Sequence, residues 1–324
     1  MRIAWLVRRL VHAAGLMLAV LVLNFVLVHL APGDPADVIA GEMGGASVEV
    51  MTGIRMRYGL DQPLPVQLLR YLAQVLSGDL GYSYYFNKPV SYLVFERIGA
   101  TALLVTVAIA TAIVLGTFFG VLAAHKPRGV TAQLVTVISV TGFAAPVFWT
   151  GMMFLLLFAS ALPIFPVSGM SDMGHERHGL AWVLDVGHHL FLPAMTLALV
   201  YIAQYSRQAR AGMLAALAAD YIRTARAKGL GEARVVYRHA LRNALIPIIT
   251  IAGLQFGQVL AGAVLVETVY SWPGLGRLAY ESILRRDSPT LLGILLCSSA
   301  MVIIANLLTD AAYRLADPRI RSAG

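Results

Sequence analysis

The side chains that could carry out chemistry are few in this chain, and the lysines are the first to consider. The chain has only Lys88, Lys126 and Lys228. An ATP-binding P-loop needs Gly-Lys followed by Ser or Thr, whereas these lysines are followed by proline, proline and glycine. We therefore expect no P-loop ATP site in this chain.

One cysteine and a group of histidines are the remaining candidates for metal or redox chemistry. Cys297 lies in an apolar run, so no disulfide framework or multi-cysteine metal site can form within the chain, and the role of a small buried apolar residue fits it best. A zinc-protease helix needs His-Glu-x-x-His, but His175 and His178 are one residue too close together. A solvated polar loop explains the segment better than a metal site, and we predict no metal. The loop holds His175, Glu176, Arg177, His178, His188 and His189.

The composition indicates that the main solvent of this protein is lipid. Of the 324 residues, 58% are hydrophobic and 13% are charged, whereas soluble domains are about half apolar and about a quarter charged. The 17 acids and 25 bases are too few to cover the surface of a soluble globule of this size. The composition therefore excludes an ordinary cytosolic enzyme, a disordered chain and a nucleic-acid-binding protein, despite the net charge of +8.

Six apolar stretches have a length suited to crossing the lipid bilayer, since a transmembrane helix needs about 20 mostly apolar residues. The predicted spans are Leu10–Leu30, Ala100–Ala124, Leu134–Leu162, Leu190–Tyr205, Leu245–Val266 and Leu291–Leu308. The third span contains Pro146. The first is longer than the apolar region of a signal peptide, and no small-x-small cleavage site follows it, so we expect it to be retained.

The charges between the spans predict the orientation of the chain. With the N-terminus inside, 16 of the 25 bases fall on the inner segments, in agreement with the positive-inside rule. Both termini are then cytoplasmic, as an even number of spans requires. Two long segments, 31–98 and 163–189, lie outside, and the first includes an amphipathic helix from Pro65 to Leu76. The long inner segment, 207–243, holds eight bases and two acids.

The interior of the predicted spans is polar in places but carries no charge. No Asp, Glu, Lys or Arg lies away from the span ends, although ion-coupled secondary transporters usually keep an ionisable residue at membrane depth. That class is therefore disfavoured, and the energy for any pumping should come from a partner. We predict that Gln204, Gln255 and Gln258 line a pore, with interhelical hydrogen bonding as the alternative. Gly116–Gly120 and Gly253–Gly257 are GxxxG motifs, which allow close helix packing.

The inner segment has the pattern of a short capped helix. Asp220 suits the N-cap, because its carboxylate can accept hydrogen bonds from free N–H groups. Tyr221–Lys228 then forms about two turns, and the cation of Lys228 complements the C-terminal end of the helix dipole. Gly229 supplies the left-handed position that ends the helix.

A second helix is expected after this turn, from about Glu232 towards Asn243 and before Pro247. Two interpretations of the segment remain open at this point. It is either a rigid lever that docks on a cytoplasmic partner or a basic loop held against anionic lipid headgroups. Caps and charge do not choose between the two.

The same residues carry a resemblance to a known protein family. Asp220–Leu230 (DYIRTARAKGL) and Arg238–Pro247 (RHALRNALIP) resemble the cytoplasmic "EAA" loop of ABC-importer permeases, in particular of the dipeptide, oligopeptide and nickel permease family. Further stretches agree with that family: His29–Pro35, Tyr58–Pro63, Ser77–Gly81, Leu192–Ala194 and Glu267–Gly276. The resemblance extends over nearly the whole chain and is to the first-permease type, which has a long outer loop.

One part of the loop departs from the general EAA pattern. Arg223 and Thr224 stand where the pattern has the glutamate and the first alanine. Ala225 and Gly229 keep the alanine–glycine spacing, and the proline comes late, at Pro247. No salt bridge of the missing glutamate is therefore carried over to this chain.

The resemblance implies an all-α, multi-pass protein of the bacterial inner membrane, with six transmembrane helices and the fold of ABC type I importer permeases. The chain would be a transporter subunit and not an enzyme, with no catalytic residue, forming half of a path for di- or oligopeptides. The alternative is that the same machinery imports nickel or another small solute such as glutathione. The implied partners are a second homologous permease, two cytoplasmic ATPase subunits that bind ATP and Mg, and a periplasmic substrate-binding protein. This chain would bind no cofactor itself.

The resemblance also implies roles for residues of the inner segment and an organisation of the chain. Ala225 and Gly229 would allow close approach and end the coupling helix. The candidate contacts to the ATPase are Tyr221, Arg226, Lys228 and Leu230. We expect a first helix and long periplasmic segment at 1–97, a five-helix permease core at 98–312 that contains the coupling loop at about 207–243, and a cytoplasmic tail at 313–324.

Overall fold

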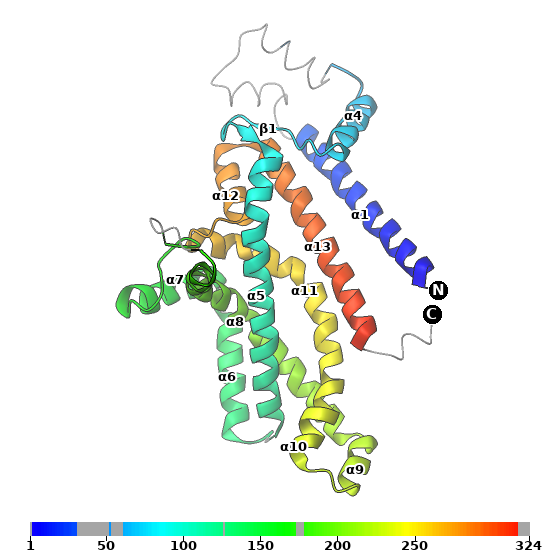
Figure 1. Ribbon diagram of the computed structural model, residues 1–324, viewed down its shortest axis with the longest axis vertical. Coiled ribbons are helices and arrows are strands. Elements are labelled where there is room, and N and C mark those ends of the chain that lie inside the picture. Colours follow the sequence, from blue (N-terminus) through cyan, green and yellow to red (C-terminus); the bar gives the residue numbers. More distant parts are fainter. Residues whose placement is uncertain (1, 31–51, 53–60, 126, 173–177, 317–324) are drawn as a thin grey trace. The chain divides into compact units, whose positions relative to one another are not determined.

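The chain is mainly helical, because in lipid the backbone N–H and C=O groups must find their partners within the chain. The computed structural model describes residues 2–30, 52, 61–125, 127–172 and 178–316 (Figure 1). Within these ranges the strands are the two short ones of a single hairpin, β1 (Tyr82–Ser83) and β2 (Lys88–Pro89). The all-α class predicted from the sequence is confirmed.

The helices differ widely in length, from single turns to more than ten turns. In chain order they are α1 (Arg2–Leu30), α4 (Leu64–Leu76), α5 (Val90–His125), α6 (Val130–Ala144), α7 (Val147–Phe154), η1 (Leu155–Ala161), α8 (Leu180–Ala218), α9 (Asp220–Ala227), α10 (Glu232–Arg234), η2 (Val235–Ala240), α11 (Leu241–Val269), α12 (Leu275–Arg285) and α13 (Ser288–Ala316). The segments η1 and η2 are π-helical.

Several of the described helices are long and apolar enough to cross a membrane. Four meet this condition: Val7–Leu27 within α1, Val90–His125, Leu180–Ala218 and Ser288–Ala311 within α13. Glu232–Gly253 and Gln255–Val269, which are bent by 55° relative to each other, form a fifth if they are taken as one span. The multi-pass membrane class is thus confirmed, whereas the number of six spans stays a prediction.

The third predicted span, Leu134–Leu162, is not one continuous helix. α6 ends at Ala144, and α7 begins at Val147 with Pro146 at its N-cap. The two helices run in different directions (Figure 1). Proline has no N–H to donate to the preceding turn and disfavours the helical conformation at the residue before it. The expectation of a single helix through Pro146 is therefore wrong, and α7 with η1 forms a shorter apolar helix, Val147–Ala161.

The chain divides into two compact units, the first of which comprises Met1–Gly99 and Leu278–Ile304. In this unit α4 packs against α1, and the side chains of His29 and Gln67 form a hydrogen bond of 3.1 Å. α4 coincides with the amphipathic helix predicted from Pro65 to Leu76, so that element is confirmed.

A buried aspartate in the first unit connects the hairpin to the start of α13. Asp287 precedes α13 and accepts hydrogen bonds from the amide of Thr290 at 3.2 Å and from its hydroxyl at 2.6 Å. The hydroxyl of Ser83, in β1, donates to the same carboxylate at 2.5 Å. Such a cap satisfies an N–H group that the helix itself leaves free, and here it also fixes the hairpin.

The second unit comprises Ala100–Arg277 and Ala305–Gly324, with α8 at its centre. α8 packs against α6, α7 and α11. The GxxxG motif of α5 faces α8 closely, because a Cβ atom at Gly120 would lie 2.5 Å from the Cβ atom of Ala209. This contact confirms that Gly116–Gly120 serves close helix packing.

The motif Glu267–Gly276, quoted above for its resemblance, folds around a fully buried carboxylate of the second unit. Glu267 accepts hydrogen bonds from the Thr101 hydroxyl at 2.6 Å and from the Arg277 amide at 3.0 Å. A Cβ atom at Gly274 or Gly276 would meet the Glu267 side chain. The glycines are needed because the chain turns directly over this carboxylate.

Candidate functional site

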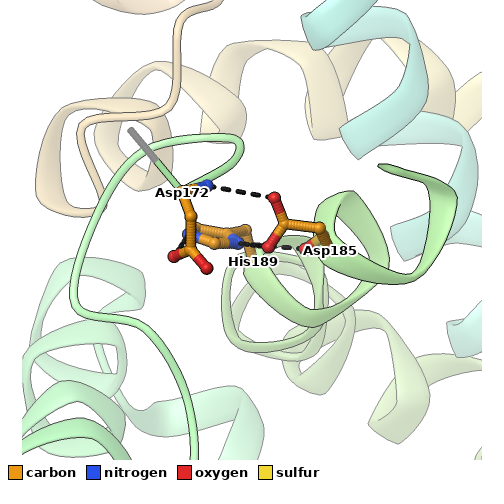
Figure 2. A group of neighbouring side chains, drawn as sticks. All are labelled: Asp172, Asp185 and His189. Atoms are coloured by element: carbon orange, nitrogen blue, oxygen red, sulfur yellow. Dashed lines mark hydrogen bonds and ion pairs between the residues drawn. The ribbon is translucent and has the colours of Figure 1, made fainter. Parts of the chain in front are cut away.

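The segment that follows η1 and the start of α8 bring three potential metal ligands together (Figure 2). Asp185 and His189 lie one turn apart on α8 and are buried, whereas Asp172 comes from the preceding segment and is exposed. One ligand atom from each residue lies within 4.8 Å of the other two. Sequence spacing alone did not predict this group, because Asp172 lies 13 residues before Asp185, outside α8.

The histidine-rich loop considered from the sequence is only partly described. His175, Glu176 and Arg177 lie outside the described residues. His178 is exposed, and Nε2 of His188 donates a hydrogen bond of 2.8 Å to the carbonyl oxygen of Ile164. The pair His175 and His178 therefore stays untested by the geometry.

The second candidate site is the short helix α9, between α8 and α10. α9 spans Asp220–Ala227, and its N-cap is Ala219, which makes no side-chain hydrogen bond to the helix. The predicted cap by Asp220 is therefore wrong: the turn from α8 is made by the extended backbone of Ala219, so Asp220 is already helical. Its carboxylate still lies in the first turn, where negative charge complements the helix dipole.

The C-terminal end of α9 agrees with the sequence prediction. Gly229 has a φ of +75°, the left-handed conformation expected of it. The amide of Leu230 donates to the carbonyl of Ala225 at 3.4 Å, and the amide of Gly229 donates to that of Arg226 at 2.9 Å. These two bonds form a Schellman motif, which gives the chain a sharp and defined turn after α9.

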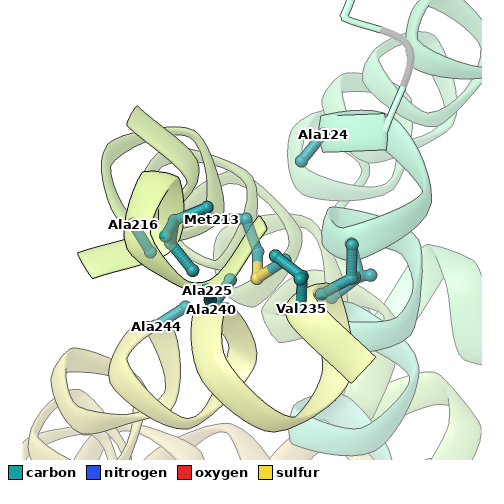
Figure 3. Close-up of a cluster of buried hydrophobic side chains, with 10 residues drawn as sticks. Ala124, Met213, Ala216, Ala225, Val235, Ala240 and Ala244 are labelled. Atoms are coloured by element: carbon teal, nitrogen blue, oxygen red, sulfur yellow. The ribbon is translucent and has the colours of Figure 1, made fainter. Parts of the chain in front are cut away.

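One face of α9 is buried in a hydrophobic cluster built from four neighbouring elements (Figure 3). Ile222 is fully buried, and Ala225 is 6% exposed. The cluster comprises Val121, Ala124, Met213, Ala216, Ile222, Ala225, Val235, Val236, Ala240 and Ala244, with Leu217, Leu230 and Leu241 packed against it. α9 is thus attached to the ends of α5, α8 and α11 rather than suspended in a loop.

The opposite face of α9 is open to solvent. Tyr221, Arg223, Arg226 and Lys228 are all exposed, and the side chain of Arg223 is 79% exposed. The Asn243 side-chain amide donates a hydrogen bond of 2.8 Å to the Tyr221 hydroxyl. α9 therefore presents a largely basic surface on a helix whose other face is held by apolar contacts.

An ion pair connects α9 to the next helix. The guanidinium of Arg226 donates to both carboxylate oxygens of Glu232, at 2.7 and 3.1 Å. This hydrogen bonding lowers the pKa of Glu232 and raises that of Arg226. The pair connects the two ends of the turn at Gly229.

The predicted coupling residues thus fall into two groups. Tyr221, Arg226, Lys228 and Gly229 are exposed, whereas Ala225 is buried and Leu230 is half-buried against the cluster. Leu230 therefore packs against the buried cluster with its side chain and closes the turn with its amide.

Sequence reasoning missed three residues that position α9. Ile222 forms its buried anchor, Glu232 pairs with Arg226, and Asn243 holds Tyr221. The spacing of Ile222 and Ala225, three residues apart on one helical face, was a signal that could have identified the buried side.

The three candidate pore-lining glutamines lie on α8 and α11, which pack together. Gln255 is buried, Gln204 is half-buried and Gln258 is exposed. Both side-chain polar atoms of Gln255 lack a hydrogen-bond partner among the described residues. A buried amide without a partner is costly unless water or another molecule reaches it.

The comparisons with known proteins agree on one family. Residues 116–322 match the family described as "Binding-protein-dependent transport system inner membrane component", and residues 2–105 match its N-terminal component family.

Curated relatives are similar over almost their whole length. The chain is 39% identical to a putative peptide permease protein of Brucella ovis, covering 97% of both chains. It is 39% identical to the dipeptide transport system permease protein DppB of Escherichia coli (strain K12), covering 98% of both. It is 37% identical to the oligopeptide transport system permease protein AppB of Bacillus subtilis (strain 168), covering 98% of this chain and 99% of the relative.

The fold has a solved counterpart. A chain of the inward-facing MetNI methionine ABC transporter superposes with a TM-score of 0.56 at 15% sequence identity, covering 70% of this chain and 97% of that chain. This likeness shows the ABC type I importer permease fold. The chain belongs to the family of binding-protein-dependent transport system inner membrane components, as a multi-pass, non-enzymatic subunit.

Proposed function

We propose that this chain forms half of the translocation path of an ATP-driven importer of di- or oligopeptides. The family membership supports the transport role. The names of the relatives, which are peptide, dipeptide and oligopeptide permeases at 37–39% identity over nearly the whole chain, support the peptide cargo.

The proposed assembly contains four further subunits. A second homologous permease completes the path, two cytoplasmic ATPase subunits bind ATP and Mg, and a periplasmic substrate-binding protein delivers the cargo. The family description, which names a binding-protein-dependent system, supports the last of these. In this arrangement both termini are cytoplasmic, 1–97 holds the first helix and the periplasmic segment, 98–312 is the permease core, and 313–324 is the tail.

The observation that carries the mechanism is the two-sided character of α9. Ile222 and Ala225 fix one face to the ends of α5, α8 and α11, and the other face is exposed. α9 acts as the coupling helix, with the exposed Tyr221, Arg226 and Lys228 in contact with an ATPase subunit. Because the buried face is packed, a displacement of α9 is transmitted to α8 and α11 instead of being absorbed in a loop.

The path itself is proposed to be neutral. Gln204, Gln255 and Gln258 line it, and the unpartnered amide of Gln255 supports a route that water or cargo can reach. A neutral lining offers few fixed charges with which to discriminate between peptides. Selectivity then resides mainly in the substrate-binding protein.

Site-specific cross-linking tests the coupling helix in the assembled transporter. The natural cysteine is first removed by Cys297→Ser, and a cysteine is then placed on α9 by Arg223→Cys. A bifunctional thiol reagent should join this position to an ATPase subunit. The matched control is Leu76→Cys, at a residue of α4 that is 84% exposed and that we expect on the periplasmic side. Equal cross-linking at both positions, or none on α9, contradicts the proposal.

Uptake into liposomes that contain the assembled transporter tests the cargo. A labelled dipeptide should accumulate only when ATP and the substrate-binding protein are both present. Uptake of labelled nickel in place of the peptide would identify the alternative cargo. Dipeptide uptake by this chain alone, without ATPase subunits, would exclude the ATP-driven mechanism.

A further inference from the structure

The group formed by Asp172, Asp185 and His189 has no role in the proposed coupling mechanism. All three residues belong to the second unit, and they come from two places in the chain. Asp185 and His189 share one face of α8, and Asp172 is brought to them by the segment after η1 (Figure 2). The group combines one imidazole with two carboxylates.

The imidazole of His189 is oriented as a metal ligand would be. Its Nδ1 atom lies 2.9 Å from the backbone carbonyl oxygen of Asp185. A carbonyl oxygen can only accept a hydrogen bond, so Nδ1 carries the proton. Nε2 then presents a lone pair on the side of Asp172. Ligating histidines usually donate their other ring N–H to a carbonyl or carboxylate in this way.

The spacing on that side suits two ligands of one ion. Nε2 of His189 and Oδ1 of Asp172 lie 3.6 Å apart, which is beyond the usual range of a hydrogen bond, about 2.7–3.2 Å. Two ligands bonded at about 2.0–2.2 Å to a tetrahedral ion are separated by roughly 3.4 Å. The carboxylate of Asp185 belongs to the same group, whose ligand atoms lie within 4.8 Å of one another, and its Oδ1 atom lies 3.5 Å from Nδ1 of His189. A rotation of this carboxylate towards Nε2 would be needed for it to bind the same ion.

Burial and charge favour a cation at this place. The side chains of His189 and Asp185 are each 3% exposed, whereas that of Asp172 is 49% exposed. A buried carboxylate is costly unless it is paired and hydrogen-bonded, and a cation here would add to the hydrogen bond that Asp185 accepts from the Asp172 amide. The exposed side of Asp172 gives an ion access from solvent and leaves room for a water ligand. Imidazole with carboxylate suits zinc or nickel better than calcium or magnesium.

We propose that Asp172, Asp185 and His189 bind one divalent transition-metal ion of the zinc or nickel type. The ion fastens the segment after η1 to α8. Two other contacts already direct this segment: Nε2 of His188 binds the carbonyl of Ile164, and the amide of Asp172 binds Oδ2 of Asp185 at 3.0 Å. The metal adds a further connection at the end of the segment.

Cobalt(II) is the probe for this site, since cobalt bound by nitrogen and oxygen ligands in a four-coordinate site absorbs visible light. The full chain is purified in its transporter complex, treated with a chelator and titrated with cobalt(II), and zinc is then added. We expect absorption that saturates at one ion per chain and is removed by zinc. Asp172→Asn and His189→Gln should weaken binding tenfold or more, whereas His12→Gln, a change at a histidine of α1 in the first unit, should not. No saturable absorption, or equal binding by Asp172→Asn, overturns the proposal.

Thermal unfolding provides a second measurement that does not depend on transport. Asp172 is exposed, so Asp172→Asn is expected to fold. Zinc should raise the unfolding temperature of the wild-type complex and leave that of Asp172→Asn unchanged. No effect of zinc on the unfolding temperature of the wild-type complex, or an equal rise in Asp172→Asn, shows that the metal proposal is wrong.

Discussion

The guanidinium of Arg226 and the carboxylate of Glu232 form a two-point ion pair across the turn that ends α9, with distances of 2.7 and 3.1 Å. Both side chains are about half exposed, at 45% and 51%. An exposed pair contributes little to global stability, but a two-point geometry fixes direction. The pair therefore acts mainly on the angle between α9 and the helix that continues into α11.

Exchange of the two charges tests this role. Arg226→Glu places two carboxylates across the turn and should lower ATP-driven uptake by about two- to fivefold, a size typical for the loss of an exposed pair. The double variant Arg226→Glu with Glu232→Arg should recover most of the loss. Uptake and ATP hydrolysis are measured together in liposomes, with Arg223→Ala as the control on the same exposed face. A double variant no better than the single one would show that the pair with Glu232 is not needed for uptake and that the ATPase contact of Arg226 accounts for the loss.

The same pair predicts a dependence on pH. The hydrogen bond from Arg226 lowers the pKa of Glu232 below its ordinary value of 4.5. A lowered folded-state pKa means that the contribution of the pair is fully present above pH 4.5 and is lost as the pH falls through the lowered pKa. Above this acidic range, hydrogen exchange at the amides of Gly229 and Leu230 should be slower in the wild type than in Glu232→Gln. Within the range, the rate of the wild type should rise to that of the variant. Parallel pH profiles for both proteins would exclude the effect.

The sequence predicted the position of α9 and of its end, but not its attachment. Gly229 could be identified because a left-handed position after a polar helix has few alternatives to glycine. Ile222 is buried in a cluster with Val121, Met213 and Val235, which belong to other elements than α9. Local patterns do not carry such contacts.

Two other features were missed by the sequence prediction, one for a local reason and one for a non-local reason. Pro146 divides the third predicted span because it has no N–H to donate. The prediction missed this break because it rested on the apolar composition of the span. The grouping of Asp172 with Asp185 and His189 could not be predicted, since 13 residues separate the two aspartates. By contrast, the Gly116–Gly120 spacing was sufficient to predict a close helix contact, because residues four apart lie on the same face of α5.

Comparison of alanine substitutions at Gly229 and Gly231 tests the effect of backbone strain alone, since neither substitution causes a steric clash. A Cβ atom at Gly229 meets nothing within 4 Å, and the same is true at Gly231. Gly229 has a φ of +75°, whereas Gly231 has a φ of −61°. Gly229→Ala should destabilise the turn by about 1 kcal/mol, because an alanine is strained in the left-handed region. Gly231→Ala should be neutral.

Uptake at matched expression and proteolysis of the turn are the measurements for this glycine pair. The two variants should differ clearly. The transporter with Gly229→Ala should take up cargo more slowly, and its turn should be cleaved faster, than with Gly231→Ala. Equal behaviour of the two variants would mean that the left-handed turn is not needed for coupling.

The buried anchor of α9 should respond in a graded way to loss of volume. Ile222 is fully buried, so Ile222→Val should cost about 0.5–1.5 kcal/mol and Ile222→Ala about 2–5 kcal/mol. If the anchor transmits movement, uptake per ATP hydrolysed should fall in the same order. Thr224→Ala, at an exposed position of the same helix, is the control. Normal coupling in Ile222→Ala, at normal expression, would show that the apolar attachment of α9 is not the route of transmission.

Close packing between α5 and α8 predicts opposite effects for two glycine-to-alanine changes. A Cβ atom at Gly120 would lie 2.5 Å from the Cβ atom of Ala209, whereas one at Gly187, within α8, meets nothing within 4 Å. Gly120→Ala should therefore force the helices apart and cost about 1–3 kcal/mol. Gly187→Ala should instead stabilise its helix by roughly 0.5–1 kcal/mol, because alanine loses less backbone freedom. Thermal unfolding of the purified complex measures both. A stabilising Gly120→Ala would show that α5 and α8 do not meet at this glycine.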